Sequence, residues 1–78
     1  MPVHIYPNKI YTLYSPELKE LITELSREHK YRLEEEEDEE EEVKYIRLVN
    51  GNYRITFVFM KVEQKYILHY IEVIALRE

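Results

Sequence analysis

The chain has 78 residues, no cysteine and a formal net charge of −5 at pH 7. This length predicts a single domain, residues 1–78, and the lack of cysteine excludes disulfide frameworks, thiolate metal sites and catalytic thiols. No apolar run is longer than that of residues 57–60, which is far shorter than the roughly 20 residues that cross a bilayer, and residues 1–15 lack the features of a secretory signal. We expect a cytoplasmic protein without membrane contact.

The negative charge is concentrated in one segment. Residues 34–42, EEEEDEEEE, carry nine carboxylates, so the other 69 residues have a net charge of +4, because −5 minus −9 is +4. The sequence therefore describes a mildly basic domain with an acidic, exposed segment. Its abundant charged residues and tyrosines are also typical of thermostable proteins. The histidines lack metal-ligand spacing and the single glycine offers no phosphate-binding loop, so no metal or cofactor is expected.

Two short β-like pieces open the chain, residues 3–6 and 9–14, and Pro7-Asn8 suits a turn between them. At least the second piece is expected to be a strand. Ser15-Pro16-Glu17 then predicts a helix start, with Ser15 as the cap and Pro16 at the first helical position. One apolar stripe follows at helical spacing and should cover a sheet: Leu18, Leu21, Ile22 and Leu25.

Three structures are compatible with residues 31–42. The helix could continue through the glutamates, or break near residues 26–30 into a helical hairpin. Alternatively, residues 31–36 and 40–43 could pair as a polar edge hairpin that turns at Asp38. Like charges weaken each arrangement, so we expect a solvated, mobile segment. It could also cover a basic face of this protein or of a partner, or bind divalent cations loosely.

Residues 43–78 hold most of the apolar mass and predict three successive strands. Asn50-Gly51 predicts a two-residue type I′ turn, which would place Arg47 opposite Arg54. Alternation then assigns two faces. The predicted core face carries Ile46, Leu48, Tyr53, Ile55, Phe57 and Phe59, and the opposite face carries Tyr45, Arg47, Arg54, Thr56 and Val58.

A second turn at Glu63-Gln64 would return the chain as a last strand. Its even positions extend the core face and its odd positions the other face, because alternate side chains point to opposite sides. The even set is Tyr66, Leu68, Tyr70 and Ile74, and the odd set is Ile67, His69, Ile71, Val73, Ala75 and Arg77. The predicted fold is α+β, with an antiparallel sheet of four or five strands and one main helix packed on one face.

The basic residues of the non-helix face suggest an anion site. Two arginines placed directly opposite each other repel, so Arg47 and Arg54 should flank a carboxylate, either Glu72 or one of the acidic run, or else wait for an anion. Guanidinium suits phosphate because its planar fork presents paired donors. His69 could move a proton near neutral pH, although a histidine on an apolar strand is more often a packing residue.

The order of elements resembles the RelE/ParE superfamily of small toxins. Residues 14–18, YSPEL, match the family's entry into its helix, and residues 47–57, RLVNGNYRITF, match its hairpin motif R-L-x-x-G-[DN]-Y-R-I-x-[YF]. The last strand is similar too, with Arg77 near its end. The resemblance covers about residues 9–78, and it departs in net charge and in the helical region.

The resemblance implies a ribosome-dependent mRNA interferase that binds RNA on the sheet face opposite the helix. It implies catalytic roles for Arg54, Arg77 and His69, and contacts to RNA phosphate from Arg47, Tyr45 and Lys44. Implied partners are RNA or the ribosome and an antitoxin-like protein. A homodimer through the non-helix sheet face is a further expectation.

Two other functions fit the sequence. One is a non-enzymatic protein-binding module that uses the acidic segment and the apolar last strand. The other is an idealised, designed scaffold, because the only glycine stands at a hairpin turn and the helix start is well formed.

Overall fold

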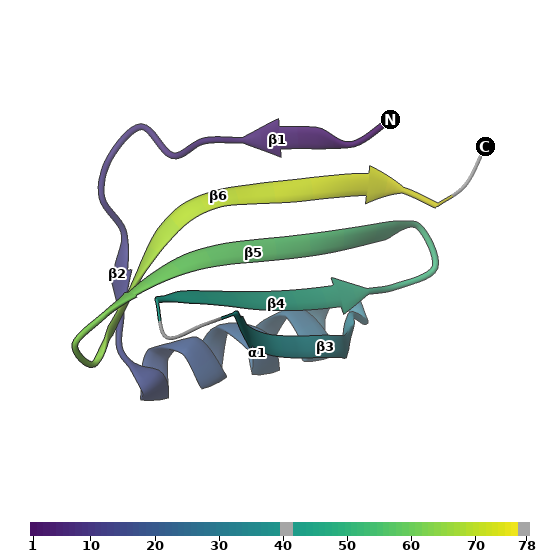
Figure 1. Ribbon diagram of the computed structural model, residues 1–78. Helices are drawn as coiled ribbons and strands as arrows, with labels where there is room; N and C mark the ends of the chain where they lie inside the picture. The colour runs from purple at the N-terminus through teal and green to yellow at the C-terminus, as the bar shows by residue number, and fades with distance from the viewer. Residues whose placement is uncertain (40–41, 77–78) are drawn as a thin grey trace.

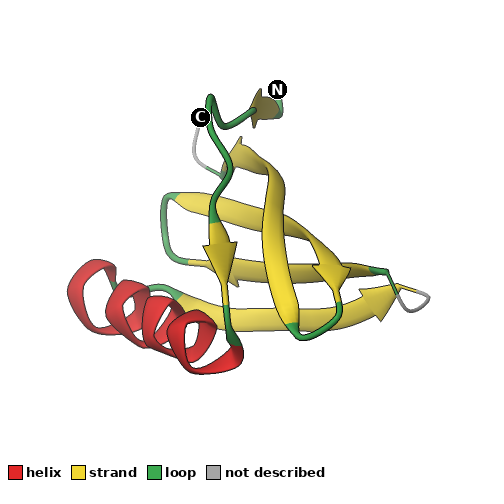
Figure 2. Ribbon diagram, turned by 90° about the vertical axis from the view of Figure 1, so that its left-hand side faces the viewer, coloured by secondary structure: helices red, strands yellow, loops and turns green. Residues whose placement is uncertain are grey.

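The computed structural model describes residues 1–39 and 42–76 and shows one helix on one face of an antiparallel sheet (Figures 1 and 2). The sheet order is β1-β6-β5-β4-β3, and β2 also pairs with β6, so six strands are described where four or five were predicted. The α+β fold class is confirmed. The elements are β1 Val3–Ile5, β2 Thr12–Leu13, α1 Ser15–His29, β3 Arg32–Glu39, β4 Val43–Val49, β5 Tyr53–Val62 and β6 Lys65–Ala75.

Both N-terminal pieces are strands, and both pair with β6. β1 pairs with residues 71–73 and β2 with residues 66–67, so together they form one interrupted strand along the outer side of β6. The chain then enters α1 with Tyr14, rather than Ser15, at the cap position. The carboxylate of Glu17 accepts a hydrogen bond from the Tyr14 N–H at 2.7 Å, which satisfies a backbone donor at the start of the helix.

The core lies between α1 and the sheet. Leu18 is the buried residue of the helix, while Ile22 and Leu25 pack against the core from the next turns, as the apolar stripe predicts. The largest fully buried side chains, Ile46, Leu48 and Phe59, are all from the predicted core face of β4 and β5. The helix-side assignment of that face is therefore confirmed.

The β4–β5 turn is centred one residue later than predicted. The Asn50 N–H donates to the Tyr53 carbonyl at 3.0 Å, which places Gly51 and Asn52 at the centre, and Gly51 has no positive φ. The type I′ prediction is thus wrong. Instead, Asn50 Oδ1 accepts hydrogen bonds from the N–H groups of Asn52 and Tyr53, each at 2.8 Å. The Asn50 amide also donates to the His29 carbonyl at 3.2 Å, which ties the turn to the end of α1.

This shift changes the cross-strand partners but not the faces. A turn centre displaced by one residue moves every partner by two positions, and two is the period of a strand. Arg47 therefore lies opposite Thr56, and Arg54 opposite Val49. The predicted direct pairing of Arg47 with Arg54 is wrong, although both remain on the face opposite α1.

The β5–β6 turn at Glu63-Gln64 is confirmed, because Val62 pairs with Lys65. Farther along, Leu68 pairs with Phe59 and Tyr70 with Val58, which leaves His69 as the extra residue of a β-bulge. The extra residue reverses the alternation, so the predicted faces are wrong beyond it. Tyr70 and Ile74 join the face opposite α1, while Ile71, Val73 and Ala75 move to the helix side.

The acidic run forms an edge strand. β3 pairs with β4 from Arg32 to Glu39, with a bulge at Glu34, so the helical alternatives and the expected loop are wrong. The polar edge hairpin is the nearest of the three alternatives, although the strand continues past Asp38, where that alternative turned. Residues 32–37 are solvent-exposed, as expected. No helix within residues 1–39 and 42–76 is long and apolar enough to cross a membrane.

Candidate anion-binding face

The face opposite α1 carries a continuous row of polar side chains. Each member is the cross-strand partner of the next, so the row crosses the sheet from β1 through β6, β5 and β4 to β3. We call it the polar row; its members are His4, Glu72, Thr56, Arg47 and Glu35. An imidazole, two carboxylates, a hydroxyl and a guanidinium thus lie side by side, a set able to bind an anion and to move protons.

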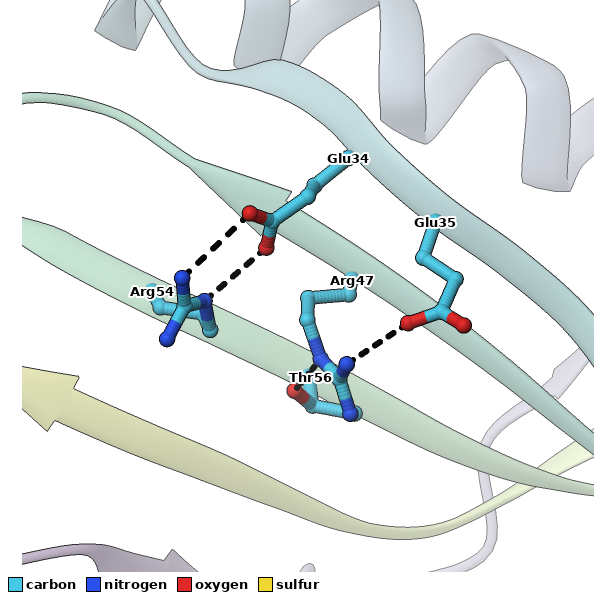
Figure 3. A network of polar contacts seen from close by, with 5 residues as sticks. All are labelled: Glu34, Glu35, Arg47, Arg54 and Thr56. Carbon is cyan, nitrogen blue, oxygen red and sulfur yellow. Dashed lines mark hydrogen bonds and ion pairs between the residues drawn. The ribbon is translucent and has the colours of Figure 1, made fainter.

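Arg47 lies at the centre of the densest contacts. Its Nη1 donates to Glu35 Oε1 at 2.6 Å and its Nε donates to Thr56 Oγ1 at 3.2 Å (Figure 3). The Arg47 side chain is 37% exposed, whereas Thr56 is only 4% exposed. The buried hydroxyl therefore fixes one edge of the guanidinium, and Glu35 occupies a donor that a ligand anion would otherwise use.

Arg54 holds a second carboxylate. Its Nε donates to Glu34 Oε1 at 2.9 Å and its Nη2 donates to Glu34 Oε2 at 3.3 Å, a two-point contact. Figure 3 shows Glu34 and Glu35 extending from β3 across β4 toward these guanidiniums. The bulge at Glu34 makes this possible, because an extra residue in β3 aims two successive side chains at the same face. The arginines therefore flank carboxylates of the acidic run, as predicted.

A third arginine belongs to this cluster. Arg32 pairs with Val49, whose other neighbour is Arg54, so it lies on the same face. The hydrogen bond from Arg54 lowers the pKa of Glu34, and the positive charges of Arg54, Arg47 and Arg32 lower it further, in opposition to partial burial. The same hydrogen bond raises the pKa of Arg54. We call Arg32, Arg47 and Arg54 the arginine cluster.

Lys44 does not join this cluster. It lies on the helix side of β4, 7% exposed, where its Nζ contacts Glu36 Oε2 at 2.8 Å and lies 5.8 Å from the centre of the Tyr66 ring. Lys44 therefore has a structural role, because a buried charge needs a partner and its ammonium group is paired with the Glu36 carboxylate. The structure thus separates Lys44 from the arginines with which the sequence grouped it.

His69 lies at the β6 bulge and is exposed, so the expected packing role is wrong. Its ring centre is 5.1 Å from that of Tyr70 and 6.3 Å from that of Tyr6. Tyr6 and Tyr70 are 5.4 Å apart, and His4 is 5.3 Å from Tyr70. We call His4, Tyr6, His69 and Tyr70 the aromatic cluster.

Of the remaining predicted site residues, one lies on the face opposite α1 and one lies outside the described part of the chain. Tyr45 lies opposite Val58 on the same face as the arginines and is half-buried. Arg77 falls outside the described residues. Sequence reasoning missed His4 and considered Glu72 only as a carboxylate beside the arginines, whereas the structure places the His4 and Glu72 side chains 3.1 Å apart. Only the pairing of β1 with β6 brings them together, and nothing local in the sequence marks that pairing.

A metal site has no support in the described part of the chain, where no group of three or more potential ligands converges. Comparison with protein-family models, curated protein sequences and solved structures finds no match. The resemblance to RelE/ParE toxins therefore stays a prediction, and the argument for function rests on the face itself.

The pKa of Glu34 offers a direct test of this geometry. Because its folded pKa is lowered, its ion pair stabilises the fold above the pKa of the unfolded chain, and this contribution is lost as pH falls through the folded pKa. Titration of the Glu34 carboxyl carbon by NMR should give a pKa below the ordinary value of a glutamate side chain. Arg54→Ala should raise the value toward normal, and Arg47→Ala should raise it less. An unchanged Glu34 titration in Arg54→Ala would contradict the contact.

Proposed function

We propose that this chain is a RelE/ParE-like protein that binds RNA through the phosphate groups, with Arg54 and Arg47 as the contacting residues. One observation carries the proposal: two guanidiniums on an open sheet face each already hold a carboxylate. Carboxylate and phosphate present similar oxygen pairs to a guanidinium. The contacts with Glu34 and Glu35 therefore resemble those that a phosphate would make.

The acidic strand limits this binding in the proposal. A phosphate has to displace Glu34 from Arg54, and Glu35 from Arg47, before it gains the same donors. The side chains involved are between 33% and 47% exposed, so solvent and ligand reach them without unfolding of the sheet. A second copy of the chain that covered this face would have to bury the charged side chains of the polar row. We therefore propose RNA rather than a homodimer as its partner.

We further propose that the protein cleaves ribosome-bound mRNA. The arginine cluster would stabilise the charge that develops on a reacting phosphate. His69 is exposed on the same face, but it lies on β6, two strand spacings from β4 and at least two residues along the strand from the partner of Arg47, a separation of about 12 Å or more. Supporting observations for RNA binding are thus stronger than those for cleavage.

RNA binding is tested by exchanging single arginines. At low salt, Arg54→Ala should weaken binding of a single-stranded RNA about tenfold or more, since a charged hydrogen bond contributes about 1.5–3 kcal/mol. The matched control is Arg27→Ala, which removes an exposed arginine of α1 and should have little effect. Electrophoretic mobility or fluorescence anisotropy measures the affinity. Equal affinities for the two variants would reject the phosphate role of Arg54.

The same preparations test cleavage. Wild-type protein added to ribosomes carrying message should cut the mRNA, and Arg54→Ala should cut it far more slowly. If the protein binds RNA but never cuts it, with or without ribosomes, the proposed binding function stands and the proposed nuclease activity is rejected.

A second candidate function is the binding of a basic protein segment, which could be antitoxin-like. The specific observation is that β3 is the outermost strand of the described sheet and carries exposed glutamates. A strand edge presents unpaired backbone groups that an extended segment can join, and its charge would select a cationic one.

Charge reversal on β3 tests this second function. Glu37→Lys should abolish salt-sensitive binding of an extended arginine-rich peptide, while Glu24→Lys, the same change on the exposed side of α1, should preserve it. Isothermal titration calorimetry measures both. Binding that is equal for the two variants, or absent in the wild type, would reject the edge of β3 as the binding surface.

A further inference from the structure

The aromatic cluster lies beside the polar row on the same face of the sheet. Tyr70 is the cross-strand partner of Val58, and Val58 is the partner of Tyr45, so an aromatic line runs parallel to the polar row one pleat away. Two residues along a strand separate the lines by about 7 Å. Tyrosine side chains therefore lie on the same surface as the arginines.

The bulge at His69 creates this arrangement. In a regular strand, His69 and Tyr70 would point to opposite faces. The extra residue instead leaves both rings on the face opposite α1, where their centres lie 5.1 Å apart at an angle of 82°. A structural reason for placing two consecutive rings together on an open face is not evident, because neither ring enters the core cluster.

Tyr6 adds an accessible ring to this pair. It extends from the end of β1, its ring is tilted by 34° against Tyr70, and the residue is 65% exposed. His4, beneath it, contacts Glu72 through Nε2 and meets the edge of Tyr70. These contacts hold the aromatic cluster in place, while Tyr6 itself stays largely exposed.

We propose that the aromatic cluster is a nucleobase-stacking subsite for single-stranded nucleic acid, with Tyr6 as its outer platform. The inference rests on the proposed RNA-binding function and extends it by naming the substrate class. Stacking on an aromatic ring needs an unpaired base, which a duplex does not offer. Tyr70 lies two strand spacings and one pleat from Arg47, about 12 Å, so one short strand can place a base on the cluster and a phosphate on the arginines.

Charge favours this ligand over an apolar protein partner. The cluster shares its face with three arginines, and the carboxylates that contact two of them, Glu34 and Glu35, extend from β3, at the sheet edge farthest from the cluster. A nucleic acid strand offers both the anionic and the aromatic groups that this combination fits. Sequence specificity is not implied, since every base has a face that can stack.

The experiment compares two oligomers of equal charge: a single-stranded oligouridylate and an abasic ribose-phosphate strand of the same length. Fluorescence anisotropy with the full chain should show that the base-bearing strand binds about tenfold more tightly or better. Tyr6→Ala should remove this preference without changing abasic binding, and Tyr6→Phe should retain it. Tyr14→Ala removes another exposed tyrosine, at the start of α1, and should have no effect.

The outcomes separate the two proposals. Equal binding of both oligomers by the wild type, or a preference that survives Tyr6→Ala, overturns the stacking subsite and leaves phosphate binding intact. If neither oligomer binds, the proposed RNA-binding function is overturned and the subsite with it. A preference that falls equally in Tyr6→Ala and Tyr14→Ala also overturns the subsite, because it would show a general loss of structure.

Discussion

The arrangement of the sheet depends on pairing an acidic strand with a basic one. Most residues of β3 carry a carboxylate, and these carboxylates repel one another along the strand. β3 pairs with β4 only because cationic side chains contact the carboxylates on both faces of the sheet. On the open face, Arg47 contacts Glu35 and Arg54 contacts Glu34. On the helix side, Lys44 contacts Glu36. The acidic run is thereby an integral edge of the fold.

That constraint also defines the candidate site. The arginines that hold β3 in place are the ones that would bind phosphate. The carboxylates of β3 and a bound phosphate would therefore compete for the same hydrogen-bond donors. A chain with a net charge of −5 can carry this arginine cluster because its surplus negative charge is concentrated in one segment, whose Glu34 and Glu35 contact Arg54 and Arg47. Any anion that binds there must match the two-point contact that Glu34 already makes with Arg54.

The spacing of apolar residues along the chain predicted the structural features that depend on local sequence alone. The amphipathic helix, the core face of β4 and β5, and the arginines opposite the helix all follow from the spacing of apolar residues. The bulges at Glu34 and His69 could not be predicted, because one extra residue in a strand has no local signature here. The first aims two glutamates at the arginines, and the second assembles the aromatic cluster. The His4–Glu72 contact likewise depends on long-range strand pairing.

Amide hydrogen exchange in β3 tests the central claim most directly. The β3 amides paired with β4 should be protected at low ionic strength. They should lose protection near 1 M salt, where the screening length falls to about 3 Å, while the β5–β6 amides stay protected. Rapid exchange throughout β3 at low salt would contradict a paired acidic strand. Protection that is insensitive to salt would show that the carboxylate–cation contacts do not hold it.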